Sequence, residues 1–350
     1  MSYLIVLYIS PKKKKETKMS IVTIQYITLY ISYYVPYVIL VIGNVGCLCN
    51  FITFTAKQLR RNSCGWYFLM SAVFDFCYIN FGLFTKLSTE QYGSTLQNTN
   101  LAWCRLRVFL TWVLPCFSTG YLVLASIDRY LSTSTSTKLR SFSQLKVAYR
   151  MTCIPIILYT ITTSHQFVFY DLRPTCSPLA GTYAYLLSLY SIVWTSFVPQ
   201  GLMLIFGLLT YYNIHKSHQR LIQTKQQQSA TNQPPRSRTD SQLITITLMQ
   251  VLCSSVLLNI RSGYYAYTVL STGLTKDSYR KAVESLILQI SSFIFYFNFT
   301  KSFFINTLTS RLFRKVFKDR MYFIYYRRAR IQPDLDHSNT QARTRTIRTN

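Results

Sequence analysis

The chain has 350 residues, of which 49% are hydrophobic and only 14% are charged, and its formal net charge is +27. Ordinary soluble domains carry roughly 25% charged residues, so the composition argues against a water-soluble globular protein. Most of the positive charge lies between and after the apolar runs described next, where membrane topology accounts for it. We therefore expect no nucleic-acid partner.

Long uncharged apolar runs follow one another along the chain. Most of them approach or exceed the roughly 20 residues that a helix needs to cross the hydrocarbon layer of a membrane. The seven runs cover about residues 27–56, 64–85, 108–127, 151–170, 181–215, 243–260 and 285–300. The sequence predicts an all-α membrane protein, a multi-pass bundle of seven transmembrane helices in the lipid bilayer.

Lys and Arg are concentrated in alternate connections. The connections after the first, third and fifth runs and the carboxyl-terminal segment are basic, whereas residues 86–107, 171–180 and 271–284 mix a few bases with acids. Cytoplasmic loops carry an excess of Lys and Arg, so we expect the amino terminus outside the cell and the carboxyl terminus in the cytoplasm. A basic cluster at residues 12–18 lies on the side expected to be extracellular; a basic outer tip, or translation starting at Met19, would account for it.

One charged residue, Asp75, lies well inside an apolar run. Because a charge at the centre of a bilayer costs several kcal/mol, this carboxylate should face a packed or hydrated interior and have a function. A polar residue at a helix interface is the alternative. The third run ends on Asp128, Arg129 and Tyr130, an adjacent acid and base at the expected cytoplasmic boundary.

Cysteine placement predicts a disulfide. Of the nine cysteines, only Cys104 and Cys176 fall in the expected outer regions. The extracellular compartment is oxidising, so we expect these two to pair and to tie the second outer loop to the third helix.

Several features in the correct order resemble the rhodopsin-like G-protein-coupled receptors, over about residues 27 to 318. Cys104 stands 25 residues before Arg129, the separation that this family shows. The chain also has Gly43-Asn44 in the first run, Pro199 midway along the fifth, and a "TSRLFRKVF" segment like the family's short amphipathic helix. The resemblance implies an extracellular amino terminus at 1–26, a seven-helix receptor domain at 27–308, an amphipathic helix at 309–320 and a cytoplasmic tail at 321–350.

The resemblance also implies roles for polar residues. Asp128 would hold Arg129 in an ion pair that loosens on activation, when the arginine of this Asp128-Arg129-Tyr130 motif meets a heterotrimeric G protein. Asp240 is a candidate second restraint, or equally a solvated linker charge. An interior polar network and candidate allosteric sodium site would be formed by Asn44, Asp75, Ser118 and Asn298. Lys301, which the family lacks, could instead neutralise Asp75, and no other cofactor or metal is expected.

The chain departs from the family at positions used for activation. Ser302, Phe303 and Asn306 stand where the seventh-helix Asn-Pro-x-x-Tyr motif has its asparagine, proline and tyrosine, and Gly207 stands where an activating tyrosine is common. The sixth run has no proline and the fourth has no tryptophan. The helix movements used by the family must therefore be achieved differently here or be impaired.

Residues at the outer ends narrow the ligand class. Thr111 stands where amine receptors of this family carry an aspartate, and Tyr296 stands where opsins carry a lysine, so amines and retinal are disfavoured. Arginines and aromatic rings at the outer mouth suit a peptide, with guanidinium groups for carboxylates; an interfacial aromatic belt with snorkelling arginines is the alternative. The candidate ligand contacts are Arg105, Arg107, Thr111, Trp112, Arg261, Tyr264 and Tyr265.

These observations predict a ligand-activated receptor of the plasma membrane that signals through heterotrimeric G proteins. The segment "TKSFFINTLTSRLFR", residues 300–314, most resembles invertebrate FMRFamide-like peptide receptors. This favours a neuropeptide, although a small-molecule ligand stays open. A chemosensory receptor of the same architecture is the main alternative, and a transporter is less supported because the runs contain one buried acid. No spacing typical of a metal or nucleophile site occurs, so we expect no enzymatic activity. Hydroxyls in the tail, Ser338 to Thr349, could recruit arrestin once phosphorylated.

Overall fold

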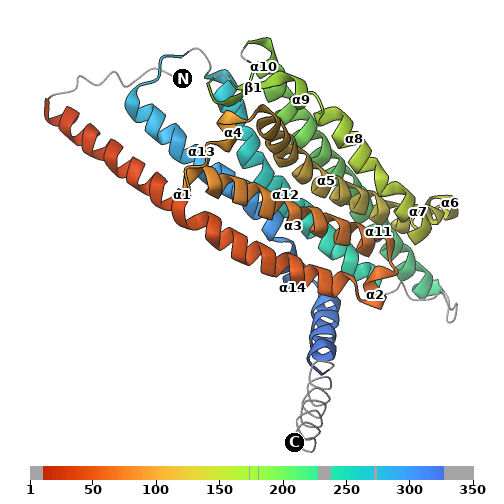
Figure 1. The fold of residues 1–350 in the computed structure, drawn as a ribbon. Helices are drawn as coiled ribbons and strands as arrows, with labels where there is room; N and C mark the ends of the chain where they lie inside the picture. Colours follow the sequence, from red (N-terminus) through yellow and green to blue (C-terminus); the bar gives the residue numbers. More distant parts are fainter. Residues whose placement is uncertain (1–10, 173, 180, 228–237, 272–273, 327–350) are drawn as a thin grey trace, which may run out of the picture.

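Almost all of the described chain is helical. The computed structural model describes residues 11–172, 174–179, 181–227, 238–271 and 274–326. The long helices lie side by side in an elongated bundle, and one short hairpin caps one of its ends (Figure 1). The predicted all-α architecture is thus confirmed for this part of the chain.

Within the described ranges, six helices are long and apolar enough to cross a membrane. Three of them come first in the chain: α1 (Pro11–Phe54), α3 (Ser63–Glu90) and α5 (Leu101–Thr133). The fourth consists of α10 (Thr182–Leu189), the π-helical segment η1 (Tyr190–Phe197) and α11 (Val198–Gln227) in continuous succession. The last two are α12 (Arg238–Leu270) and α13 (Ser278–Thr300). Their positions agree with six of the seven predicted runs.

The predicted run at 151–170 is not one helix. It falls into α7 (Leu145–Met151), α8 (Cys153–Thr163) and α9 (Gln166–Phe169), none of which alone is long enough to span a membrane. Pro155 lies in the first turn of α8, and because proline has no N–H it cannot donate to the carbonyl of Met151. The structure therefore supports six spanning helices directly, one fewer than the seven predicted.

Side-chain caps fix where three of the long helices begin. Asn62 accepts a hydrogen bond from the backbone N–H of Cys64 at the start of α3, and Asn100 accepts one from Trp103 at the start of α5, each at 3.0 Å. Asp277 accepts one from Ser278 at 2.7 Å at the start of α13. Such caps satisfy amide groups that have no partner within the helix.

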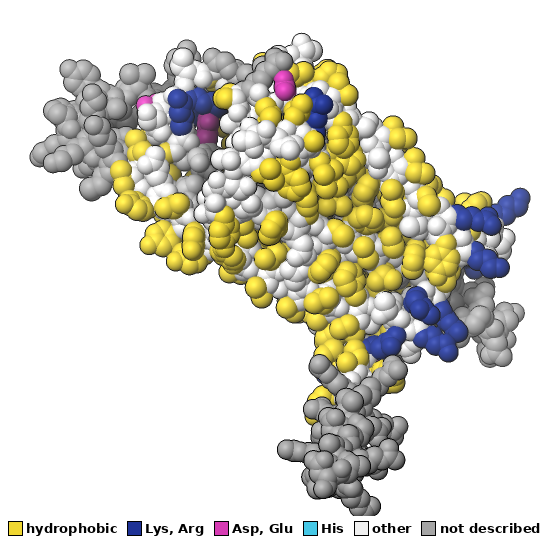
Figure 2. Space-filling view, viewed as in Figure 1, with side chains coloured by type: hydrophobic (Ala, Val, Ile, Leu, Met, Phe, Trp, Pro, Cys, Tyr) yellow, Lys and Arg dark blue, Asp and Glu magenta, His cyan; other side chains and the backbone are white. Residues whose placement is uncertain are grey.

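Helix α5 lies at the centre of the bundle and contacts α3, α8, α11 and α12. Large apolar side chains on the outer helices remain exposed, among them Val41, Ile161, Leu208 and Val256, each more than 60% accessible. These side chains form a broad apolar surface along the bundle (Figure 2). Such a surface suits contact with lipid tails rather than water.

The two ends of the bundle differ in charge. The hairpin end carries α4 (Leu96–Thr99) and the antiparallel strands β1 (Tyr170–Leu172) and β2 (Cys176–Pro178). The basic end carries α2 (Lys57–Arg60), α6 (Thr137–Ser141) and α7. On the face shown in Figure 2, the basic end carries Lys and Arg, whereas the hairpin end carries Asp and Glu together with a few Lys and Arg.

The carboxyl-terminal elements pack onto the bundle and then leave it. After α14 (Ser302–Thr309) a helix covers residues 311–326 and turns away from the bundle axis (Figure 1). Phe313 and Val316 on this helix are buried, and the Phe313 ring centroid lies 5.4 Å from that of Phe54. These two side chains of the predicted 309–320 helix thus pack against the bundle. The tail hydroxyls lie outside the described residues.

Candidate functional site

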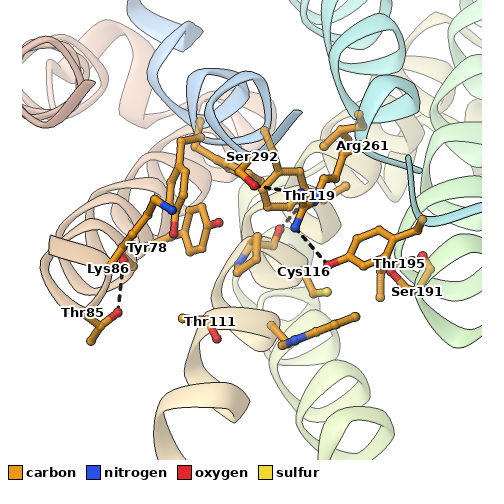
Figure 3. A pocket seen from close by; sticks show the side chains of 18 of the residues that line it. Tyr78, Thr85, Lys86, Thr111, Cys116, Thr119, Ser191, Thr195, Arg261 and Ser292 are labelled. Atoms are coloured by element: carbon orange, nitrogen blue, oxygen red, sulfur yellow. Dashed lines mark hydrogen bonds between the residues drawn. The ribbon is translucent and has the colours of Figure 1, made fainter. Parts of the chain in front are cut away.

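A cavity of about 410 Å3 lies toward the hairpin end, between α3, α5, η1, α12 and α13 (Figure 3). Its volume falls within the roughly 300–1,000 Å3 typical of small-ligand sites. The π-helical segment contributes Ser191, Thr195 and Ser196 to the wall. Pro199 is the second residue of α11, just after this segment. It cannot donate to the carbonyl of Thr195, which accounts for a wider turn at this place.

Five of the seven predicted ligand contacts line this cavity: Arg107, Thr111, Trp112, Arg261 and Tyr265. The other two make structural contacts nearby. Arg105 Nε donates to the carbonyl oxygen of Tyr170 in β1 at 3.0 Å, and the Tyr264 hydroxyl donates to the carbonyl oxygen of Glu284 at 3.4 Å. Arg173, in the connection at residues 171–180, lies outside the described residues.

Sequence reasoning missed most of the polar lining. The missed residues are mainly hydroxyl-bearing side chains within apolar runs, with one charged pair on α3: Thr85, Lys86, Thr89, Glu90, Thr119, Ser191, Thr195, Ser262 and Ser292. Serine and threonine are common in membrane helices, so their presence carries no signal of its own. Lys86 and Glu90 could have been found, because an acid four residues after a base at the end of an apolar run predicts a pair on one helix face.

The predicted disulfide is confirmed. Cys104 at the top of α5 is bonded to Cys176 in β2, and their Cα atoms are 5.7 Å apart. The backbone N–H of Cys176 also donates to Asn98 Oδ1 at 3.1 Å, which fastens the hairpin to α4, the short helix before α5. The hairpin is thereby held at the end of the bundle where the cavity lies.

The predicted interior polar residues separate into distinct contacts. Ser118 Oγ donates to Asp75 Oδ1 at 2.5 Å, so these two meet as expected. Asn44 instead exchanges hydrogen bonds with Asn80, at 3.1 and 2.7 Å. Asn298 Oδ1 instead accepts a hydrogen bond from the ammonium of Lys301, whose Nζ lies 2.5 Å away.

Lys301 affects whether a sodium ion fits here. Its Nζ also donates to the Asn298 carbonyl at 2.7 Å and to Ser254 Oγ at 2.9 Å, and it acts electrostatically on Asp75. The ammonium is thus hydrogen-bonded to oxygen atoms that a small alkali cation would need as ligands. In the described part of the chain, no ion pair shorter than 4 Å joins Lys301 to Asp75. Sodium binding stays a prediction that these contacts disfavour.

Asp128 and Arg129 form an ion pair near the basic end. Arg129 Nη2 lies 2.5 Å from Asp128 Oδ2. Arg129 is 1% exposed and Asp128 is 4% exposed. Asp128 Oδ1 also accepts from Ser143 Oγ at 2.7 Å, and Arg129 Nη2 donates to Asn62 Oδ1 at 3.1 Å. The side chain of Asp240, the candidate second restraint, lies outside the described residues.

A second cavity, of about 370 Å3, opens beside this pair and is lined by Arg61, Ser132 and Arg140 together with Arg129. The ring of Tyr130 packs against Phe206 of α11, with centroids 5.5 Å apart. The Asp128-Arg129-Tyr130 segment therefore joins α5 to its neighbours at the basic end.

No protein-family model matches the chain, and no curated protein sequence matches it significantly. The arrangement of the residues is thus the basis for a functional proposal.

Proposed function

We propose that the chain is a ligand-activated receptor of the plasma membrane, of the rhodopsin-like type, that signals through heterotrimeric G proteins. In this proposal α7, α8 and α9 together form the missing span, which gives seven. The basic end faces the cytoplasm, as the excess of Lys and Arg favours, and the hairpin end with its disulfide faces the oxidising exterior.

The observation that carries the proposal is the position of two features on one helix. Helix α5 supplies Arg107, Thr111 and Trp112 to the cavity at the hairpin end and the buried pair of Asp128 and Arg129 near the basic end. Arg107 and Arg129 are 22 residues apart, which corresponds to about 33 Å along an α-helix. A ligand and a cytoplasmic partner would therefore contact the same rigid element from opposite sides of the bilayer.

A ligand in the cavity would act through relative movement of the helices. The cavity wall is shared by α5, α12 and α13, so a change in their packing alters the cavity. The ligand shifts the equilibrium only by binding one packing more tightly than the other. In the active packing Arg129 leaves Asp128 and binds the G protein. The size of the cavity and its mixed polar and aromatic lining favour part of a peptide, such as a neuropeptide, as the ligand.

The test is nucleotide exchange on purified heterotrimeric G proteins, with the chain reconstituted in lipid and a panel of short amidated and free-acid peptides as agonists. We expect at least one peptide to accelerate exchange, and Arg129→Ala to abolish the acceleration. Arg150→Ala removes an exposed arginine of α7 at the same end and should leave the response intact. A full response in the Arg129→Ala protein would contradict the proposed switch.

Orientation is tested separately with single-cysteine reporters at Lys138 and Asp277. We expect impermeant thiol reagents to label Asp277→Cys from outside intact cells and to label Lys138→Cys only after the membrane is opened. Labelling of both sites from one side would contradict the proposed topology.

A further inference from the structure

The charges of the cavity near the hairpin end are unbalanced. Four side chains that are charged at neutral pH line it: the bases Lys86, Arg107 and Arg261 and one acid, Glu90. Glu90 forms an ion pair with Lys86, whose Nζ lies 2.6 Å from Glu90 Oε1. Lys86 Nζ also donates to Gln289 Oε1 at 3.0 Å. Among the described residues, no carboxylate forms an ion pair with either arginine.

Arg107 is the less satisfied of the two arginines. Its Nε is buried and has no hydrogen-bond partner among the described residues. Leaving a buried donor unpaired costs about 1–3 kcal/mol, and more when the group is charged. A ligand that supplies an acceptor at this position would recover that cost.

In the part of the chain that the structure describes, the groups that hold Arg261 in place are neutral. Its guanidinium donates to Ser292 Oγ at 2.8 Å, to Ser291 Oγ at 3.1 Å and to the Tyr265 hydroxyl at 3.2 Å. The group also lies 4.7 Å from the centroid of the Tyr265 ring. The contacts among Arg261, Ser292 and the neighbouring tyrosine are drawn in Figure 3. They orient the guanidinium without neutralising it, so its positive charge is directed into the cavity in advance of binding.

Both arginines line the same cavity as Tyr296 of α13. The Tyr296 ring stacks on the Tyr78 ring, with centroids 5.1 Å apart. The ring centroids of Trp112 and Tyr265 lie 6.4 Å apart. The two cationic groups therefore share a cavity whose remaining wall is largely aromatic and hydroxyl-bearing.

We propose that the cavity recognises a carboxylate on its ligand through Arg107 and Arg261, with an aromatic group of the ligand against the tyrosine and tryptophan rings. A guanidinium pairs with a carboxylate through two parallel hydrogen bonds, whereas a carboxamide has one acceptor oxygen and no charge. The ligand is then a free acid and not an amidated peptide. This inference deepens the proposed receptor function and rests on it only for the biological meaning of the ligand.

The test compares the dipeptide N-acetylphenylalanyltyrosine as the free acid and as the carboxyl-terminal amide. Binding is measured by thermal stabilisation and by calorimetry on the purified full chain in lipid discs without G protein. We expect the acid to bind at millimolar concentration and at least roughly tenfold more tightly than the amide.

Variants that remove a positive charge test whether the two arginines cause the preference for the acid over the amide. Arg107→Gln and Arg261→Gln should each abolish the preference for the acid, and Arg107→Lys should retain part of it. Arg105→Gln is the matched control, because it removes the same charge from the same helix outside the cavity. Unfolding midpoints show whether each variant is folded, and the amide, which needs neither charge, should bind to all of them equally.

Equal binding of acid and amide, tighter binding of the amide, or no binding of the acid at millimolar concentration would overturn the inference. Its failure is distinct from failure of the receptor proposal. Nucleotide exchange evoked by amidated peptides alone would support the receptor proposal and contradict the carboxylate site. A preference for the acid that depends on Arg107 and Arg261, without nucleotide exchange, would support the carboxylate site and contradict the receptor proposal.

Discussion

The ammonium of Lys301 lies 2.5 Å from Oδ1 of Asn298, in the buried interior between α12, α13 and α3. It is an internal cation in the region where the resemblance to receptors implies a sodium ion. Because Lys301 also donates to Ser254 and acts on Asp75, it supplies the positive charge that the buried carboxylate requires.

This relationship predicts that the protein does not respond to sodium. Replacing sodium with N-methylglucamine should leave the unfolding midpoint of the unaltered chain unchanged. In Lys301→Met the oxygen atoms of Asp75 and Asn298 become accessible, and sodium at ten times its dissociation constant should stabilise the variant by about 1.4 kcal/mol. Midpoints measured in the two salts at equal ionic strength check this, and a sodium response of the unaltered chain would contradict it.

Under the proposed receptor function, Asp128→Asn should raise nucleotide exchange in the absence of ligand. The amide keeps the shape of the carboxylate and can still accept a hydrogen bond, but it no longer pairs with the charge of Arg129. Each 1.4 kcal/mol of lost pairing would increase the active population by about tenfold while that population is small. Ser143→Ala removes the bond to Asp128 Oδ1 and should produce a smaller rise. Unchanged basal exchange in Asp128→Asn would argue against the restraint.

Cys104→Ser and Cys176→Ser should each lower the free energy of unfolding by roughly 2–5 kcal/mol, the usual effect of losing a native disulfide. The bond closes a loop between residues 72 apart, and its loss frees the hairpin. The double variant should be no less stable than either single variant, since both remove the same bond. Cys153→Ser, which changes an exposed free cysteine, is the control and should have little effect in thermal unfolding.

Gly65→Ala should destabilise the basic end. A Cβ at Gly65 would lie 2.3 Å from the backbone oxygen of Leu59, and a backbone atom cannot rotate away as a side chain can. We expect a loss of about 1–3 kcal/mol, as for other overpacked sites. A Cβ at Gly201 meets nothing within 4 Å, so Gly201→Ala should be neutral or stabilise α11 by up to about 1 kcal/mol. Similar unfolding midpoints for the two variants would contradict this packing.

The amino-acid sequence by itself determined the features that depend on composition along the chain. Apolar runs long enough to cross a bilayer predicted six observed helices, because every backbone polar group in lipid must be satisfied within its own segment. The basic and mixed connections predicted two ends of different charge. The disulfide was predictable since only Cys104 and Cys176 lie outside the apolar runs and their boundaries.

Only the tertiary structure decided which polar side chains meet. Asn44 pairs with Asn80 rather than with Asp75, and Lys301 reaches Asn298 and Ser254. The unpaired Nε of Arg107 is likewise visible only once the cavity is formed. Hydropathy sets the length and the order of the helices, but their rotation about their own axes follows from side-chain packing between segments far apart in sequence. A partner on another helix therefore leaves no trace in the local sequence.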